Sequence, residues 1–144
     1  MAEHRLCWAD LATVDDREAA TFYAALFGWS PRPHVHARGR LTMLEDEGTR
    51  VASLYRLTRA QIARNVPSHW LPYVSTADVS RSVSRAHALG GQVIVDRQRF
   101  PGRASIAVVA DPTGALIGLW QSDAGAGERA GVERDDAPAT EGNR

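Results

Sequence analysis

A tryptophan and an aspartate stand two residues apart in the first apolar segment of the chain, as Trp8 and Asp10. Residues i and i+2 of a β-strand point to the same face of a sheet, so we expect both side chains on one side. A carboxylate beside an indole in a partly dry site has its charged form disfavoured, which suits it to general acid or base work. Asp10 is therefore the candidate catalytic residue; the alternative is a structural aspartate held by hydrogen bonds.

A second tryptophan, Trp70, opens a similar apolar segment later in the chain. If Trp8 and Trp70 both face a cavity, they offer flat walls on which an aromatic ligand can stack. The alternative places both indoles in the core beneath the helices. Alternation along the first strand puts Trp8 opposite the helix-facing Ala9 and Leu11, which favours the cavity side for Trp8.

Two further groups of side chains could contact a ligand. The segment RQRFPGRA is expected to be a loop at the rim of a pocket, with Phe100 as an apolar contact and Arg103 as a forked donor for an acidic group, assisted by Arg97 and Arg99. The alternative is a loop whose arginines are only solvated. His34, His36 and His69 are the one histidine set that could form an unusual metal site, and the alternative is exposed histidines on an edge strand.

The elements that position these residues are repeated. At an offset of 62, a tryptophan, a helix-starting aspartate and a helix-ending glycine coincide in both halves, as the pairs Trp8 and Trp70, Asp16 and Asp78, and Gly28 and Gly90. Such a repeat indicates two copies of one supersecondary unit. We expect Tyr73, which this offset makes equivalent to the helix-facing Leu11, to face a helix as well.

Each unit is predicted to run strand, helix, strand, strand, strand. The first helix should start at Asp15 or Asp16, where Asp15 and Glu18 have the spacing of a capping box. The segment 30–36 contains two prolines, which indicates an edge strand. A type I turn is expected at 111–114, DPTG, between the last two strands.

Three phrases of the sequence, DDREAATFYAALFGW, ALGGQVIVD and VVADPTGALIGLWQ, resemble the vicinal oxygen chelate superfamily of glyoxalases, bleomycin-resistance proteins and extradiol dioxygenases, and especially its actinobacterial glyoxalase-like branch. The resemblance implies an α+β fold in which two tandem βαβββ modules form a curved mixed sheet shaped as a cup. A single domain is then expected over 5–122, with module one at 5–57, a linker at 58–69 and module two at 70–122. The polar segment 123–144 is expected to be a disordered tail.

Metal-using members of this superfamily hold their cation with one residue from the first strand and one from the last strand of each module. The resemblance places these positions here at Trp8, at Trp70 or Leu71, at Gly118, and at Ser53 or Ala52. None of these side chains is a good ligand for zinc or iron. We therefore expect no metal and no other cofactor, and we regard Ser53 and Gly118 as ligand-contacting positions of the cup.

Composition narrows the possible partners. Seventeen basic and 17 acidic residues give a net charge of zero, so nothing attracts the chain to nucleic acid or to an anionic membrane. No apolar run approaches a membrane span, and the segment MAEHRLCW has no signal-peptide pattern. A single cysteine indicates no disulfide framework, so we expect a cytoplasmic protein. A homodimer is expected from the resemblance and the small size of the domain.

Two functions are compatible with these features. The first is metal-independent binding of a small, largely apolar or aromatic metabolite, with the sequestering role of the bleomycin-resistance branch. The second is a metal-free isomerase, cyclase or lyase of natural-product metabolism that uses Asp10 as acid and base. A metal-dependent lyase or dioxygenase is the third.

Overall fold

A computed structural model describes residues 4–36, 39–100 and 104–123 of the 144-residue chain. The first module contains β1 (Leu6–Thr13), α1 (Asp16–Phe27), β2 (Ser30–His36), β3 (Gly39–Asp46) and β4 (Thr49–Arg56). A short helix, α2 (Arg59–Ala63), begins the connection to the second module. That module contains β5 (His69–Ser75), α3 (Val79–Ala88), β6 (Gln92–Phe100), β7 (Ala104–Ala110) and β8 (Leu116–Ser122).

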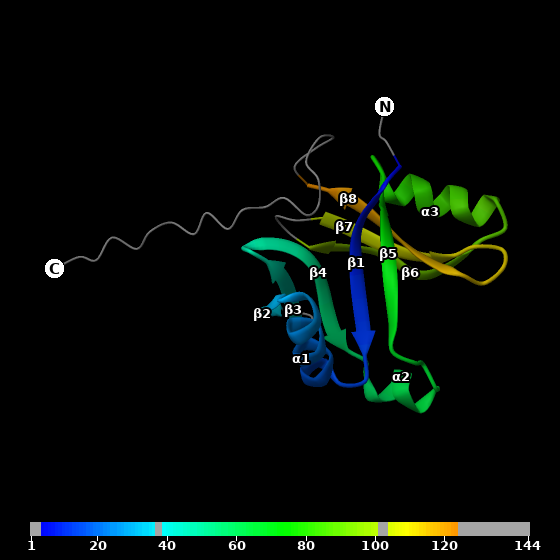
Figure 1. The fold of residues 1–144 in the computed structure, drawn as a ribbon. Helices are drawn as coiled ribbons and strands as arrows, with labels where there is room; N and C mark the ends of the chain where they lie inside the picture. The colour runs from blue at the N-terminus through cyan, green and yellow to red at the C-terminus, as the bar shows by residue number, and fades with distance from the viewer. Residues whose placement is uncertain (1–3, 37–38, 101–103, 124–144) are drawn as a thin grey trace.

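The two modules share one mixed sheet (Figure 1). Its strand order is β2-β3-β4-β1-β5-β8-β7-β6. Within each module the first strand lies parallel to the last, β1 beside β4 and β5 beside β8, and the modules are joined by the antiparallel pair of β1 and β5. The predicted α+β fold with two βαβββ modules is confirmed, and the sheet is continuous within one chain.

The start of each module's helix is built in the same way. Asp15 caps α1 by accepting from the backbone N–H of Glu18 at 3.0 Å, and Asp78 caps α3 by accepting from that of Arg81 at 3.0 Å. Such caps satisfy donors that the helix itself cannot pair. A threonine two residues earlier, Thr13 or Thr76, donates to the carbonyl of the capping aspartate in both modules. Equivalent positions are therefore 63 residues apart.

The repeat is real, but for the first strand and the helix cap the offset of 62 is wrong by one residue. It holds at the end of the helices, where Gly28 and Gly90 both have positive φ. Because side chains alternate along a strand, a shift of one residue moves a side chain to the opposite face of the sheet. At an offset of 63, Trp8 is equivalent to Leu71 and Asp10 to Tyr73. The strand pairing agrees, since Trp8 lies opposite Tyr73 and Asp10 lies opposite Leu71 across the β1–β5 pair.

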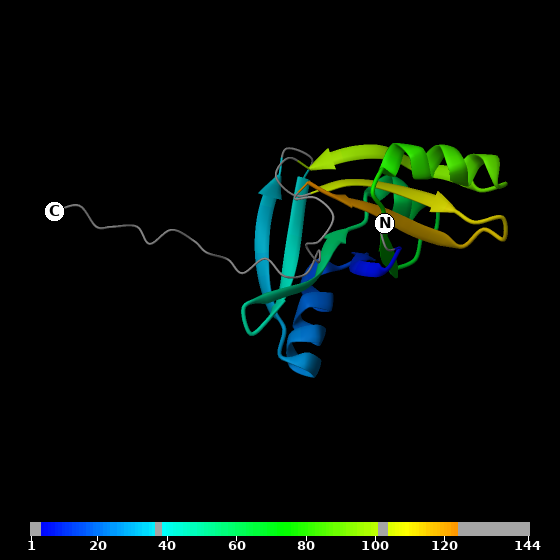
Figure 2. The same ribbon diagram turned by 90° about the horizontal axis from the view of Figure 1, so that it is seen from above.

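Two apolar clusters lie on the two sides of the sheet. The inner face is defined here by the buried side chains of Trp8, Met43, Leu71, Tyr73 and Val108, which come from both modules and form one cluster. The opposite side of module one packs the buried Leu11, Leu44, Ala52 and Leu54 against α1 residues such as Ala20 and Tyr23. Figure 2 shows that the two halves of the sheet turn against each other instead of lying in one plane, which brings β3 and β7 to a common cluster.

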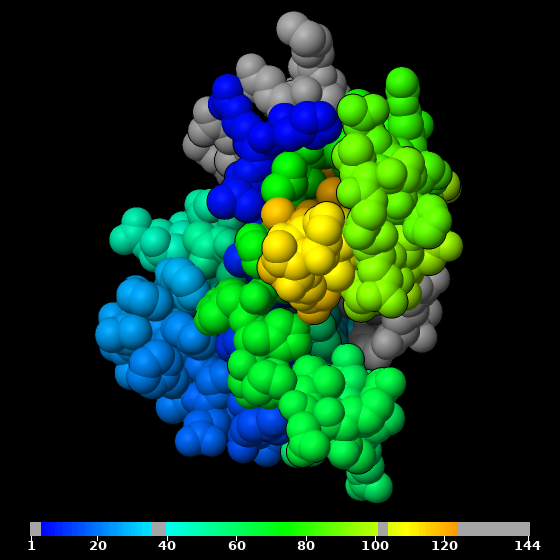
Figure 3. All heavy atoms as spheres, turned by 90° about the vertical axis from the view of Figure 1, so that its right-hand side faces the viewer, coloured from blue at the N-terminus to red at the C-terminus, as the bar shows by residue number. Residues whose placement is uncertain are grey.

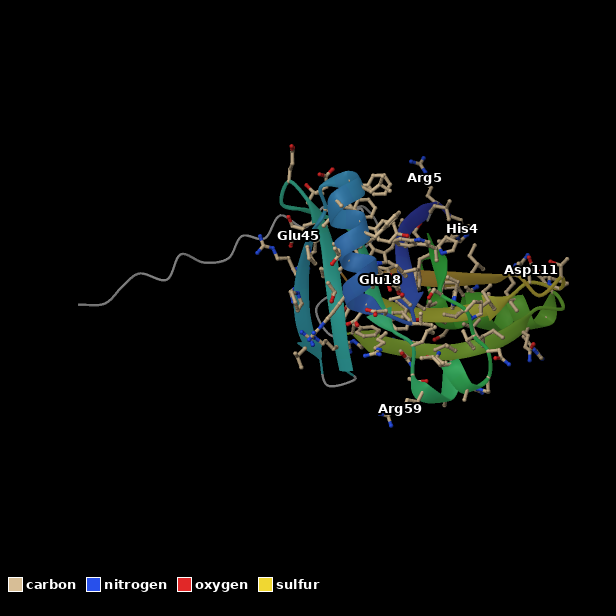
Figure 4. All side chains as sticks on the ribbon, turned by 60° about the horizontal axis from the view of Figure 1, so that its bottom comes forward. His4, Arg5, Glu18, Glu45, Arg59 and Asp111 are labelled. Carbon is tan, nitrogen blue, oxygen red and sulfur yellow. The ribbon has the colours of Figure 1, made fainter. Side chains whose placement is uncertain are left out.

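The ends of the module-two strands differ in part from expectation. The predicted turn is present, because Asp111 accepts from the backbone N–H of Thr113 at 2.8 Å and its carbonyl accepts from Gly114 at 2.9 Å; it lies at the far end of module two (Figure 4). The expected loop 97–104 is largely strand, since β6 extends to Phe100. Arg103 and the tail residues 124–144 lie outside the described residues.

No helix within the described ranges is both long enough and apolar enough to span a bilayer.

Candidate functional site

The centre of the inner face carries a carboxylate. Asp10 stands in the middle of β1, paired with Ser53 of β4 on one side and with Leu71 of β5 on the other. Its carboxylate accepts a hydrogen bond from Ser53 Oγ and a second one, at 2.8 Å, from Tyr73 Oη. Asp10 is partly exposed. Residues from three strands of both modules therefore converge on one acidic group.

Trp8 completes this arrangement, which we call the Asp10 network: Trp8, Asp10, Ser53 and Tyr73. The indole Nε1 of Trp8 donates to Ser53 Oγ at 2.9 Å, so the Ser53 hydroxyl accepts one hydrogen bond from Trp8 and donates another to the Asp10 carboxylate. Trp8 is only 7% exposed. Trp8 thus lies on the predicted side of the sheet. Its indole is buried behind Asp10 and Ser53 instead of forming an exposed wall, and it holds the Ser53 hydroxyl in place.

The ring of Tyr73 occupies the space in which a side chain at position 118 would lie, because that residue is glycine. Tyr73 of β5 pairs with Gly118 of β8, the module-two counterpart of the Asp10 and Ser53 pair. A Cβ atom on Gly118 would lie 2.2 Å from Cδ1 and 2.4 Å from Cε1 of the Tyr73 ring. Glycine is required here because the tyrosine ring lies directly over its backbone, and this position lets the phenol reach Asp10.

The tyrosines around Asp10 are held in their neutral form. Burial raises the pKa of Tyr73 far above its ordinary value, and the negative charge of Asp10 and the hydrogen bond to it act in the same direction. Burial and the charge of Asp10 also raise the pKa of Tyr55 on β4. Both phenols therefore remain hydrogen-bond donors at neutral pH.

Trp120 of β8 adds an aromatic surface beside this network. Its ring centroid lies 5.9 Å from that of Trp8 and 6.0 Å from that of Tyr73, the latter in an edge-to-face arrangement. The side chain is partly exposed, but its Nε1 atom is buried and has no hydrogen-bond partner. From the sequence, Trp120 and Tyr55 are candidates for the far wall of the cup, with core packing as the alternative, and the ring contacts place Trp120 beside Trp8 and Tyr73.

The predicted placement of Trp70 in the cup is wrong. Trp70 is paired with Leu11 and lies on the α1 side of the sheet, where its Nε1 donates to Tyr23 Oη at 3.1 Å. The helix-facing placement of Tyr73 is wrong for the same reason. Both errors follow from the offset of 62, because a one-residue shift assigns every side chain of β5 to the opposite face of the sheet. Leu71 is the module-two counterpart of Trp8, and it belongs to the inner-face cluster.

The positions that resemblance assigned to metal ligands do not suit a divalent cation. Trp8 offers only an N–H, which Ser53 already accepts; Gly118 has no side chain, and its space is filled by Tyr73. Leu71 and Ala52 have no donor atoms. Among residues 4–36, 39–100 and 104–123 there is no group of three or more His, Cys, Asp or Glu side chains that could hold a metal ion. The donor set therefore does not fit the metal that the family implies.

The remaining candidates lie apart from the Asp10 network. His34 is on the edge strand β2, and β3, β4 and β1 separate that strand from His69 on β5. His69 donates from Nδ1 to the Pro67 carbonyl at 2.8 Å. Arg97 donates to Ser105 Oγ at 3.4 Å, and Arg99 pairs with Ser105. The described arginines of β6 are thus side chains of a strand, and Phe100 ends that strand partly exposed.

The fold and this donor set define the class of the protein. A sequence profile of the glyoxalase-like domain matches residues 8–119, so the chain belongs to the glyoxalase-like domain family. Among curated proteins, it is 31% identical over 118 residues to "Putative glyoxylase CFP32" of Mycobacterium tuberculosis, covering 81% of this chain and 45% of the relative. It is 29% identical over 149 aligned positions to anthracycline biosynthesis protein DnrV of Streptomyces peucetius, covering 94% of this chain and 52% of the relative.

The chain thus spans about half the length of the curated relatives that it matches. Solved structures support the fold alone. A variant of Streptomyces coelicolor methylmalonyl-CoA epimerase in complex with 2-nitronate-propionyl-CoA has a TM-score of 0.64 at 23% identity and covers 86% of this chain and 98% of the epimerase. A mutant of 4-hydroxymandelate synthase from the same organism has a TM-score of 0.60 at 20% identity, covering 88% of this chain and 40% of the synthase.

Proposed function

We propose that this protein binds a small, largely apolar, aromatic metabolite on its inner face without a divalent metal ion, and that it releases the ligand unchanged. The Asp10 network carries the proposal. Two of its members, Trp8 and Ser53, stand at positions that the resemblance assigns to metal ligands, and Tyr73 fills the space beside a third, Gly118. The donors of Trp8, Ser53 and Tyr73 are used within the network. A binding role requires no group beyond those that the inner face already presents.

The chemistry of the inner face favours an aromatic ligand. Its partly exposed side chains combine apolar surface with two aromatic rings and one carboxylate: Asp10, Leu41, Tyr55, Ile106 and Trp120. Apolar walls with a few convergent polar groups are typical of small-molecule sites. The indole of Trp120 provides a stacking surface, and Asp10 provides an acceptor for a ligand hydroxyl or amine.

A second function, metal-free proton transfer, is favoured by Asp10 itself. A partly exposed carboxylate among apolar groups can take a proton from a carbon acid and return it, which is the step of an isomerase, cyclase or lyase. DnrV is named as an anthracycline biosynthesis protein, which is consistent with a tailoring step in natural-product metabolism. In this function Tyr73 would orient the carboxylate, because its phenol is held neutral as a donor.

Tryptophan fluorescence can test binding, because the four tryptophans divide between the two faces. Trp8 and Trp120 belong to the inner face, while Trp29 and Trp70 contact Tyr23 on the α1 side. We expect a panel of polycyclic aromatic compounds, including an anthracycline, to quench the fluorescence saturably. Trp120→Phe should reduce the amplitude and the affinity, and the matched variant Trp29→Phe should leave the affinity unchanged. Equal effects of the two variants would refute inner-face binding.

Recovery of the ligand separates the two functions. After incubation with protein pretreated with a chelator, chromatography and mass spectrometry should return only the starting compound if the protein sequesters it. A new product that disappears in Asp10→Asn would support the enzyme instead. A product that forms only after a transition metal is added back would refute the metal-independent proposal.

A cytoplasmic location belongs to the same proposal. It is supported by the single cysteine, Cys7, which is partly buried and has no partner for a disulfide in its own chain.

A further inference from the structure

A second polar level lies on the inner face beyond the Asp10 network. Residues two positions apart on a strand point to the same face, so Ala12 of β1 lies on the same side of the sheet as Asp10. Ala12 pairs with Tyr55 of β4 on one side and with His69 of β5 on the other. Both side chains therefore belong to the inner face, at the end of the sheet that Figure 1 shows next to α2. We call them the Tyr55–His69 pair.

The polar atoms of this pair are accessible to a ligand. Tyr55 and His69 are both only partly buried. Within the described ranges no hydrogen bond engages the Tyr55 hydroxyl, and His69 uses only Nδ1, which donates to the Pro67 carbonyl. Neither the Tyr55 hydroxyl nor His69 Nε2 is a buried atom without a partner, so both are in contact with solvent. In the space-filling view, residues around the start of β5 reach the surface between α1 and α2 (Figure 3).

The two accessible atoms have complementary chemistry. Burial and the negative charge of Asp10 raise the pKa of Tyr55, so its phenol stays protonated and remains a donor. A neutral histidine ring that carries its proton on Nδ1 presents Nε2 as an acceptor. One donor and one acceptor thus stand on the two strands that flank β1, whose backbones are about 10 Å apart. The side chains of Tyr55 and His69 are long enough to contact one ligand group between them.

The opposite end of the inner face offers an aromatic ring instead of a donor and an acceptor. Trp120 pairs with Ser75, the last residue of β5, whereas His69 is the first residue of that strand. The ring of Trp120 is partly exposed, but its Nε1 atom is buried. A polar substituent of an aromatic ligand therefore fits the end with Tyr55, and its apolar rings fit the end with Trp120.

We propose that the Tyr55–His69 pair binds the hydroxyl group of a phenolic ligand: the Tyr55 hydroxyl donates to the ligand oxygen, and His69 Nε2 accepts from the ligand O–H. A phenolic hydroxyl satisfies both atoms at once, because one oxygen both donates and accepts. A carbonyl or an ether would leave His69 Nε2 without a donor. A carboxylate would meet the negative charge of Asp10, which acts on Tyr55 at this end of the face.

This inference rests on the proposed function, since it names the class of aromatic metabolite that the inner face takes. Equilibrium dialysis with two matched probes tests it. The first probe, 2-naphthol, carries the hydroxyl, whereas 2-methoxynaphthalene carries an ether oxygen that accepts but cannot donate. We expect the wild type to bind 2-naphthol about tenfold more tightly, because the ether leaves His69 Nε2 unpaired.

Three variants assign the two hydrogen bonds. His69→Leu should remove the preference by weakening the binding of 2-naphthol alone, by roughly three- to tenfold. Tyr55→Phe should weaken the binding of both probes by a similar factor, because both probes accept from the Tyr55 hydroxyl. The matched control Tyr23→Phe removes a phenol hydroxyl on the α1 side of the sheet and should leave both affinities unchanged.

The possible outcomes separate this inference from the proposed function. Equal wild-type affinities for the two probes, or a preference that persists in His69→Leu, would overturn the phenol assignment and leave aromatic binding intact. If neither probe binds the wild type, the proposed function fails and this inference fails with it.

Nitrogen-15 NMR of the histidine rings gives a second measurement on the wild-type protein. The Nε2 resonance that is missing from the spectrum of His69→Gln identifies His69. We expect this resonance to shift when 2-naphthol is added to saturation, because Nε2 then accepts a hydrogen bond, and to shift far less with 2-methoxynaphthalene. An equal response to both probes would contradict the proposed contact.

Discussion

Adding one methyl group to Gly118 should disrupt the centre of the inner face. The new Cβ atom of Gly118→Ala would lie 2.2–2.6 Å from three atoms of the Tyr73 ring, far inside van der Waals contact. Neither the backbone at Gly118 nor the Tyr73 ring can move easily to relieve this clash. Gly118 is paired with Tyr73 on one side and with Val108 on the other, and Tyr73 is only 3% exposed and hydrogen-bonded to Asp10. The ring must therefore leave its position.

The cost has two parts. Overpacking a filled core typically costs about 1–3 kcal/mol. Moving the Tyr73 hydroxyl away from Asp10 loses a hydrogen bond to a charged group, worth roughly 1.5–3 kcal/mol. We expect a total of about 2.5–6 kcal/mol. For a domain of this size such a loss lowers the melting temperature by roughly 5–24 °C.

Urea unfolding and thermal unfolding followed by circular dichroism measure this loss. The matched background is Tyr73→Leu, in which no ring lies over the glycine. In the Tyr73→Leu background, Gly118→Ala should lower the free energy of unfolding by about 1 kcal/mol or more less than it does in the wild type, as expected for residues in direct contact. A Gly118→Ala protein that melts with the wild type, or costs that add independently in the double variant, would refute the reasoning.

Three further predictions follow from the same structure. The raised pKa values of Tyr55 and Tyr73 mean that both phenols stay protonated in the folded state at a pH where they would ionise in the unfolded state. The free energy of unfolding should therefore fall as the pH rises above the ordinary tyrosine pKa of 10.0. Urea midpoints and tyrosinate absorbance measured across this pH range check the prediction, and a flat profile would contradict it. The Cys7 thiol, whose burial raises its pKa to about 11, should react with iodoacetamide at neutral pH much more slowly in native protein than in urea, as mass spectrometry can determine. Removing the α3 cap with Asp78→Ala should cost about 0.5–2 kcal/mol in urea unfolding, and an unchanged midpoint would argue against the cap.

The Asp10 network shows where prediction from sequence reached its limit. Trp8 and Asp10 were identified together because residues two positions apart on a strand point to the same face of the sheet. Tyr73 was assigned to the wrong face, although a threonine stands two residues before each helix-capping aspartate and could have given the correct offset. Aligning the modules on Thr13 and Thr76 instead of on the two tryptophans would have placed Tyr73 beside Asp10.

The sequence by itself determined the modules, their helix caps and turns, and the side chains available at the site, because these depend on local spacing and on residue chemistry. Only the tertiary structure decided which side chains meet. Three contacts depend on the register between strands and on the curvature of the sheet: Tyr73 with Gly118, Trp120 with Trp8, and Trp70 with Tyr23 of α1. A register shift of one residue reverses the face of every side chain on a strand, so a repeat known only to within one residue leaves the site undetermined.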